Sequence, residues 1–437
     1  MTILLVILSI ALLVVLIVWA KLNPFLSFMA TAIVAGLLLG LPADQLAKSI
    51  QKGMGTLLGD LVIVIVTGAM LGKLVAESGA AQRIAGFLMG MFGEKYITWA
   101  MALTGLIVGI PLFYNVGFVL LVPLAFTLTY QYRLPAVYVG MPLLAALSVT
   151  HGFLPPHPSP AALVAQFGAN MGLTLLYGGI IAIPTIAIAG PLLAPFLKNI
   201  PSQPLPTFQA APKATADLPS IGNSLFTALL PVLLLMGTTL LSLLVPEEAS
   251  FRPVITFLAD PSVVMLASLG YATYSLGLHR KQAMTQLMDI FTTATKDISM
   301  IILIVAGAGA LKQIFTDTGV SQTIGEGLKT WEMHPLVLAW LITSVIRVCV
   351  GSATVAGLTT AGIIAPLVTT LDVNPNLLVL SIGAGSLMFS HFNDGGFWMF
   401  KEYFNVSIKD TLRSWSLMET IVAVVGLLGV LVLDLFV

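Results

Sequence analysis

The sequence predicts an all-α protein that crosses a membrane many times. Of its 437 residues, 58% are hydrophobic and only 9% are charged, with 19 Lys and Arg against 19 Asp and Glu. A soluble domain carries about 25% charged residues, so a soluble fold of this length could not cover its surface. Apolar segments of about 18 residues recur along the chain, and each can cross a hydrocarbon core about 30 Å thick. An ordinary cytosolic enzyme and a disordered chain are excluded, and the zero net charge argues against nucleic acid as a partner.

Twelve apolar segments are candidates for membrane crossings. They are 3–20, 24–41, 60–76, 97–110, 134–150, 173–197, 223–245, 262–278, 297–315, 335–350, 376–390 and 415–436. The first has no charged flank and no cleavage site, so we expect a retained helix rather than a signal peptide. Two more apolar stretches, 111–130 and 351–371, are interrupted by Pro, Gly, Ser, Thr and Asn, which is typical of re-entrant hairpins or broken helices. We therefore expect about 10–12 transmembrane helices.

The chain is predicted to consist of two related halves. Its longest polar interruption, 198–222, is rich in Pro, Ser and Gln, as exposed linkers are. Residues 77–79 (Glu-Ser-Gly) recur as 317–319 (Asp-Thr-Gly), and Thr150-His151 recurs as Ser390-His391, both 240 residues later. Inverted repeats that meet at the membrane midplane are typical of secondary transporters. We expect a first repeat, a linker and a second repeat over 1–200, 201–222 and 223–437.

Polar residues inside the apolar runs are the candidate site residues, because each costs several kcal/mol in hydrocarbon unless it is satisfied. The first cluster contains Thr150, His151 and His157, followed or interrupted by four prolines within 155–160 that cannot continue a helix. The alternative is a Pro-rich surface loop. The two histidines are six residues apart, unlike the helical i, i+4 pair of metal sites, so we expect no metal.

The equivalent cluster of the second half contains His391, Asn393 and Asp394. An acid at the end of an apolar run is by default a proton carrier or a cation ligand. Asn393 and His391 are able to donate hydrogen bonds to a carboxylate or a hydroxyl. The alternative is a polar loop at the membrane interface.

Two further clusters contain Arg347 with Ser352 and Thr354, and Asn115. The guanidinium of Arg347 suits a substrate carboxylate, and the alternative is a salt bridge for which Asp394 is a candidate. A half-helix that starts at the Gly-Ser-Ala-Thr turn would direct its positive dipole end at an anion, although small residues also serve helix packing. Asn115 would bind a hydroxyl-rich ligand or cap a helix.

Several segments resemble the gluconate permease (GntP) family of proton symporters. They are GAMLGKLVAESGAAQRIA (68–85), LSVTHGFLPPHPSP (147–160), GSATVAG (351–357), SHFNDGGFWMFKEYF (390–404) and SWSLMET (414–420). The resemblance implies the ion-transporter superfamily fold: a homodimer with inverted repeats, re-entrant hairpins and an elevator-type transport domain. It places Thr150, His151, His157, Ser352, Thr354, His391, Asn393 and Asp394 at motif positions. Asn115 stands where the family carries an acid, so Asp394 or a histidine would carry the proton, or the coupling ion differs.

Together these observations predict a secondary transporter of the bacterial cytoplasmic membrane that imports gluconate or a related sugar acid with protons and needs no cofactor. The Gly-Ser-Ala-Thr turn and Arg347 would meet the substrate carboxylate, and Asn115, Thr150 and Asn393 its hydroxyls. Asp394 would take the proton, with His151 or His391 as the alternative. Other readings are sodium coupling, a glycerate-like acid or hydroxy amino acid as substrate, a passive anion channel and, remotely, a metal-dependent membrane enzyme.

Overall fold

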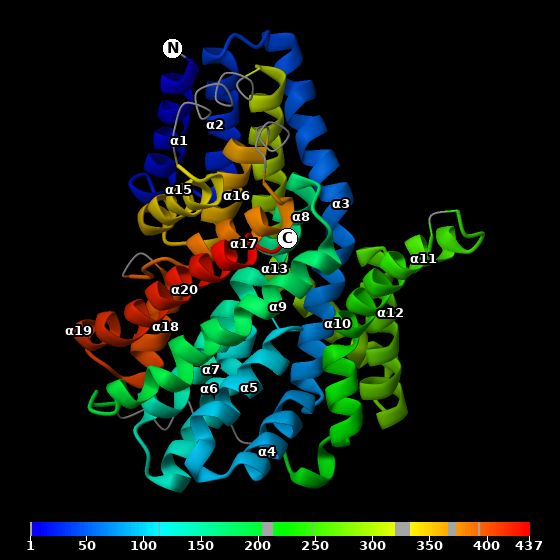
Figure 1. Cartoon of the computed structure of the whole chain (residues 1–437), viewed down its shortest axis with the longest axis vertical. Coiled ribbons are helices and arrows are strands. Elements are labelled where there is room, and N and C mark those ends of the chain that lie inside the picture. The colour runs from blue at the N-terminus through cyan, green and yellow to red at the C-terminus, as the bar shows by residue number, and fades with distance from the viewer. Residues whose placement is uncertain are drawn as a thin grey trace.

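The computed structural model of the chain is built from helices (Figure 1), and none of the residues that it describes forms a strand. It describes residues 2–112, 114–202, 213–246, 248–319, 333–365, 373–391 and 394–437. The helices of the first half are α1 (Thr2–Val18), α2 (Pro24–Leu38), α3 (Ala43–Glu77), α4 (Ala80–Phe92), α5 (Ile97–Gly109), α6 (Tyr114–Tyr132), α7 (Ala136–Phe153), α8 (Pro158–Phe167) and α9 (Met171–Ala187). Those of the second half are α10 (Ile221–Leu244), α11 (Arg252–Ala259), α12 (Pro261–Ala272), α13 (Met284–Asp317), α15 (Pro335–Val350), α16 (Ala353–Ile364), α17 (Pro375–Gly385), α18 (Gly395–Phe404), α19 (Ile408–Thr411) and α20 (Leu417–Leu433).

The two longest helices, α3 and α13, pack against each other along much of their length. Their close approach depends on glycine, since a Cβ atom added to Gly53 would lie 2.3 Å from the carbonyl oxygen of Gly309. Further along the pair, the ammonium of Lys73 lies 3.2 Å from a carboxylate oxygen of Asp297, so the two helices run antiparallel. Helix α13 begins 241 residues after α3 begins and ends 240 residues after α3 ends. Equivalent helices that run antiparallel are what an inverted repeat requires.

Each half contains two helix pairs with a short break between their members. The breaks lie after α5, after α7, after α15 and after α17, and the second-half helices begin 237 to 239 residues after their first-half counterparts. The sequence explains the breaks: Pro155, Pro156 and Pro158 cannot continue α7, and Gly351 ends α15 in a left-handed conformation with φ 76°. The breaks leave backbone groups at membrane depth that need partners.

Six helical segments of the described chain are long and apolar enough to cross a membrane, or seven if the pair α11–α12, bent by 67°, counts as one. This is fewer than the 10–12 crossings predicted from the sequence. Five more apolar helices, among them α15, α16 and α17, have only 10–17 residues. A helix rises 1.5 Å per residue, so helices of this length cross about half to most of a hydrocarbon core about 30 Å thick. The sequence count included such partial segments as complete crossings.

Candidate functional site

The broken helices surround a cavity of about 540 Å³. Its wall is formed by the first turn of α16, by α6, α7, α15, α18 and α20, and by Ile17, Pro24, Ile301 and Ile304 from α1, α2 and α13. The polar side chains that line it are Tyr114, Ser148, His151, Arg347, Ser352, Thr354, Asp394, Trp415 and Glu419. The cavity is within the range of about 300–1,000 Å³ usual for small-molecule sites.

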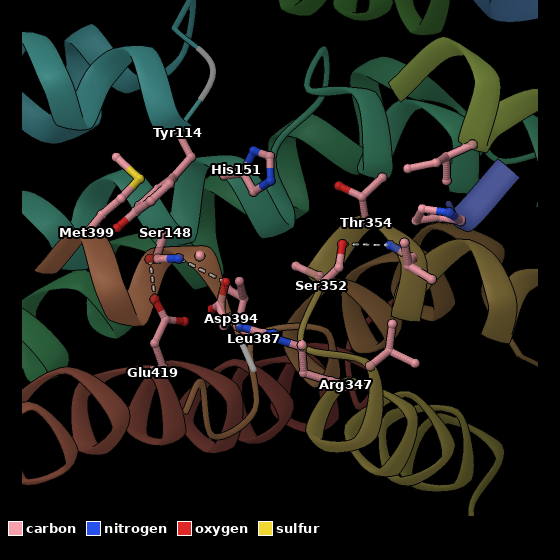
Figure 2. A pocket seen from close by; sticks show the side chains of 18 of the residues that line it. Tyr114, Ser148, His151, Arg347, Ser352, Thr354, Leu387, Asp394, Met399 and Glu419 are labelled. Carbon is pink, nitrogen blue, oxygen red and sulfur yellow. Dashed lines mark hydrogen bonds and ion pairs between the residues drawn. The ribbon is translucent and has the colours of Figure 1, made fainter. Parts of the chain in front are cut away.

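An ion pair between Arg347 and Asp394 lies in the wall of this cavity (Figure 2). The Nη2 atom of Arg347 lies 2.5 Å from Oδ2 of Asp394, and the two side chains are 4% and 17% exposed. Asp394 is also the N-cap of α18, where its Oδ1 accepts from the amide of Gly396 at 2.9 Å. The hydroxyl of Ser390 donates to Oδ2. The salt bridge considered from the sequence is therefore present, and both oxygens of Asp394 already accept hydrogen bonds.

The guanidinium of Arg347 keeps donors free for a ligand. Its Nε and Nη1 atoms are buried, and no hydrogen-bond partner for them is found among the described residues. A buried donor without a partner costs about 1–3 kcal/mol. Because the planar fork of arginine matches a carboxylate in bidentate geometry, these two nitrogens form a ready-made anion contact.

The first turn of α16 brings a second electropositive element to the cavity. Gly351 in the left-handed conformation ends α15, and Ser352 caps α16 by accepting from the amide of Val355 at 3.3 Å. Residues 351–355 all line the cavity. The start of a helix carries unpaired amides and the positive end of the helix dipole, so this turn favours a negative group.

A second buried carboxylate, Glu419 on α20, also lines the cavity, and it was not among the residues predicted from the sequence. It is only 2% exposed. Its Oε1 accepts from the hydroxyl of Ser148 on α7, and its Oε2 is buried without a partner within the described chain. The rule that selected Arg347 and Asp394, a charge inside an apolar run, also applies to Glu419 in the run 415–436.

Aromatic side chains form the rest of the polar wall. The ring of Tyr114 lies 6.1 Å from the ring of His151 and 6.0 Å from that of Trp415, centroid to centroid. The Tyr114 hydroxyl and Nδ1 of His151 are buried, and neither has a hydrogen-bond partner among the residues described. Both are therefore available to a hydroxyl-rich ligand.

Five of the predicted residues line the cavity, namely His151, Arg347, Ser352, Thr354 and Asp394, and three others do not. Thr150 is buried and donates to the carbonyl of Leu147 at 2.9 Å. His157 bonds the carbonyl of Gly109, and His391 that of Val348, each through Nε2 at 2.9 Å. Since a carbonyl only accepts, each histidine donates to a carbonyl in the last turn of a broken helix.

Two predicted residues are not placed by the structure. The backbone of Asn115 belongs to the first turn of α6, but its side chain lies outside the described part. Asn393 lies outside the described residues altogether. Their predicted contacts with substrate hydroxyls stay predictions.

Comparison with known proteins gives close relatives over the full length of the chain. It is 45% identical over 437 residues to a high-affinity gluconate transporter of Escherichia coli K12, covering 100% of both chains. It is 43% identical to a gluconate permease of Bacillus subtilis 168, again covering 100% of both. The L-idonate transporter of the Gnt-II system of Escherichia coli K12 is 42% identical, with 98% of this chain and 97% of the relative covered.

Two solved transporter structures share the fold. The YdaH transporter of Alcanivorax borkumensis superposes with a TM-score of 0.63 at 16% identity, covering 94% of this chain and 96% of the other. MtrF of Neisseria gonorrhoeae superposes with a TM-score of 0.67 at 14% identity, covering 94% of both.

The model of the GntP family permease matches residues 1–436. The relatives are named transporters and permeases, and the apolar spans agree with a multi-pass protein of the inner membrane. The predicted resemblance is confirmed, and the chain belongs to the GntP family of permeases.

Proposed function

We propose that the protein imports gluconate or a related sugar acid by symport with a cation, a proton by preference. The relatives named for gluconate and L-idonate support this substrate class. The observation that carries the proposal is the pair of unpartnered guanidinium nitrogens of Arg347 beside the first turn of α16, both in one cavity. A carboxylate bound there would satisfy the free donors of Arg347 and face the positive end of α16.

The rest of the cavity suits the hydroxyl groups of a sugar acid. Thr354, Tyr114 and His151 line the wall with groups that donate or accept hydrogen bonds. A polar wall of this kind favours a polyhydroxylated acid over an apolar one, because each buried hydroxyl left unpaired would cost about 1–3 kcal/mol. Glycerate-like acids and hydroxy amino acids remain competitors that the experiment distinguishes.

Coupling to a cation follows from the charge of the substrate. A carboxylate carries one negative charge, and its entry opposes an inside-negative potential at about 2.3 kcal/mol per 100 mV. One cation transported with it removes that opposition. We further propose a homodimer and elevator-type movement. The position of the cavity supports this movement, since α15, α16, α18 and α20 lie on one side of it and α1, α2 and α13 on another.

The test is uptake into proteoliposomes. Labelled gluconate should accumulate when the external medium is more acidic than the lumen, and unlabelled idonate should compete with it. Accumulation driven by sodium and indifferent to pH would refute proton coupling. Failure of every sugar acid, with uptake of glycerate or a hydroxy amino acid, would refute the substrate class. Counterflow of label against a gradient of unlabelled substrate separates a carrier from a channel.

A further inference from the structure

We infer that Glu419, rather than Asp394, binds the coupling proton, and that the substrate carboxylate takes the place of ionised Glu419 as the second anion facing Arg347. This assignment rests on the proposed function, since it names the group that couples the same site to protons. The inference comes from the contacts of the two buried carboxylates and from the charge that the cavity holds.

The contacts of the two acids differ. Asp394 has no oxygen left over, because Arg347 and Ser390 bond Oδ2 and the amide of Gly396 bonds Oδ1. A proton on Asp394 would have to displace one of these donors and would leave the guanidinium of Arg347 without its anion. Glu419 has one donor, the Ser148 hydroxyl, on Oε1, while Oε2 is buried without a partner in the part of the chain described. A proton on Oε2 therefore breaks no contact and removes an unpaired buried charge.

The charges of the cavity link this proton to the substrate. The charged groups that act on Glu419 are Arg347 and Asp394, and the other titratable groups facing the cavity are His151 and Tyr114. With Glu419 ionised, one guanidinium faces two carboxylates, and a substrate would add a third. With Glu419 protonated, the substrate carboxylate becomes the second anion, so the site binds it without an excess negative charge. By linkage, a bound substrate equally favours the protonated form of Glu419.

The repeat supports the same assignment. Helices α5 and α9, which correspond to α15 and α20, contain no charged residue. The break between α7 and α8, which corresponds to the break that holds Asp394, contains Pro155 and Pro156 instead of an acid. Within the described residues, the broken helices of the first half therefore supply neutral polar groups to the cavity, and the second half supplies its charges.

The experiment compares the wild-type protein with Glu419→Gln. Glutamine keeps the volume and an oxygen for Ser148, and it imitates the protonated acid. Labelled gluconate should bind to wild type about tenfold more weakly per pH unit above the titration of Glu419, as expected for one linked proton. Glu419→Gln should bind at every pH and exchange gluconate across the membrane, but accumulation driven by a pH gradient should be lost. Glu402→Gln, which neutralises an acid whose side chain is 61% exposed on α18, is the matched control and should behave as wild type.

A second variant tests the contact rather than the charge. The hydroxyl of Ser148 donates to Glu419 and favours its ionised form, so Ser148→Ala should move the fall in gluconate binding to a more alkaline pH. Should Glu419→Gln not fold, infrared difference spectra of the substrate-free wild type and Ser148→Ala proteins keep the inference testable. A carboxylic acid band should appear on acidification in both, at higher pH in Ser148→Ala, and an unchanged band would overturn the assignment.

The outcomes separate this inference from the proposed function. If wild type accumulates gluconate in a pH gradient and Glu419→Gln does so within twofold, Glu419 is not the carrier while the function stands. If wild type binds no sugar acid but the carboxylic acid band is lost in Glu419→Gln, the proposed function fails and the titration of Glu419 stands. If neither binding nor the band is seen, both are overturned.

Discussion

Replacing Arg347 by lysine should weaken gluconate binding while the protein stays folded. Lysine keeps the positive charge and one nitrogen to pair with Asp394, but it loses Nε and Nη1, the two nitrogens without partners among the described residues. A hydrogen bond to a charged group contributes about 1.5–3 kcal/mol, so losing one or more of the fork contacts should raise Kd by about 10- to 150-fold. Equilibrium binding of labelled gluconate to purified protein measures this change.

The control is Arg413→Lys, the same substitution at an exposed position of the η9 turn (Leu412–Ser416), which should bind as wild type. Thermal unfolding shows whether the Arg347–Asp394 pair has been kept. If Arg347→Lys binds gluconate within twofold of wild type, the guanidinium fork does not hold the carboxylate and the argument for the site fails. The same conclusion follows if affinity falls only together with a large loss of stability.

The stability side of the argument has its own measurement. Arg347→Gln alone leaves Asp394 buried without a counter-ion, and Asp394→Asn alone leaves the guanidinium unpaired. Breaking a buried pair from one side costs about 3–5 kcal/mol, whereas removing both charges costs less. The double variant should therefore unfold at a higher temperature than either single variant, and a strictly additive loss would contradict a coupled pair.

Three other substitutions test separate parts of the structure. Ser352→Ala removes the cap of α16 and should lower stability by about 1 kcal/mol in thermal unfolding, with weaker gluconate binding. Gly53→Ala places a Cβ atom 2.3 Å from the carbonyl oxygen of Gly309 and should lower the unfolding temperature, whereas Gly55→Ala on the same helix meets nothing within 4 Å and should not. Tyr114→Phe removes an unpartnered buried hydroxyl, so apo stability should hold while gluconate Kd rises by about 2- to 10-fold if the hydroxyl meets the substrate.

The sequence was sufficient for features that depend on local chemistry. Scarce charge and recurring apolar runs predict membrane helices, and Pro155, Pro156 and Gly351 predict where helices break. The offset of 240 residues between Thr150-His151 and Ser390-His391 predicts the paired arrangement of α3 and α13. These features follow from composition, from backbone restrictions and from comparison of the chain with itself, and none requires knowledge of tertiary contacts.

The composition of the site was less predictable, because it depends on which face of each helix meets the cavity. Ser148 and His151 are three residues apart and lie on one face of α7, while Thr150 points elsewhere and bonds Leu147. His157 and His391 meet carbonyls from helices that precede them by more than 40 residues, which no local pattern reveals. Glu419 lies in an uninterrupted helix, so attention to broken segments missed it, although its charge alone marked it out.

The uneven distribution of charge between the two halves bears on how such a site transports an anion. The backbone plan is shared, since both halves break their helices at equivalent positions and both use a histidine to bond a carbonyl near a break. The charges are not shared: Arg347, Asp394 and Glu419 all come from the second half and lie in one wall of the cavity. One cation among two acids cannot hold a further anion unless an acid takes a proton, and Asp394 has no free oxygen to take it. Concentrating the charges in one half therefore makes a single carboxylate, Glu419, decide when the substrate binds, while the first half supplies neutral partners such as Ser148 and Tyr114.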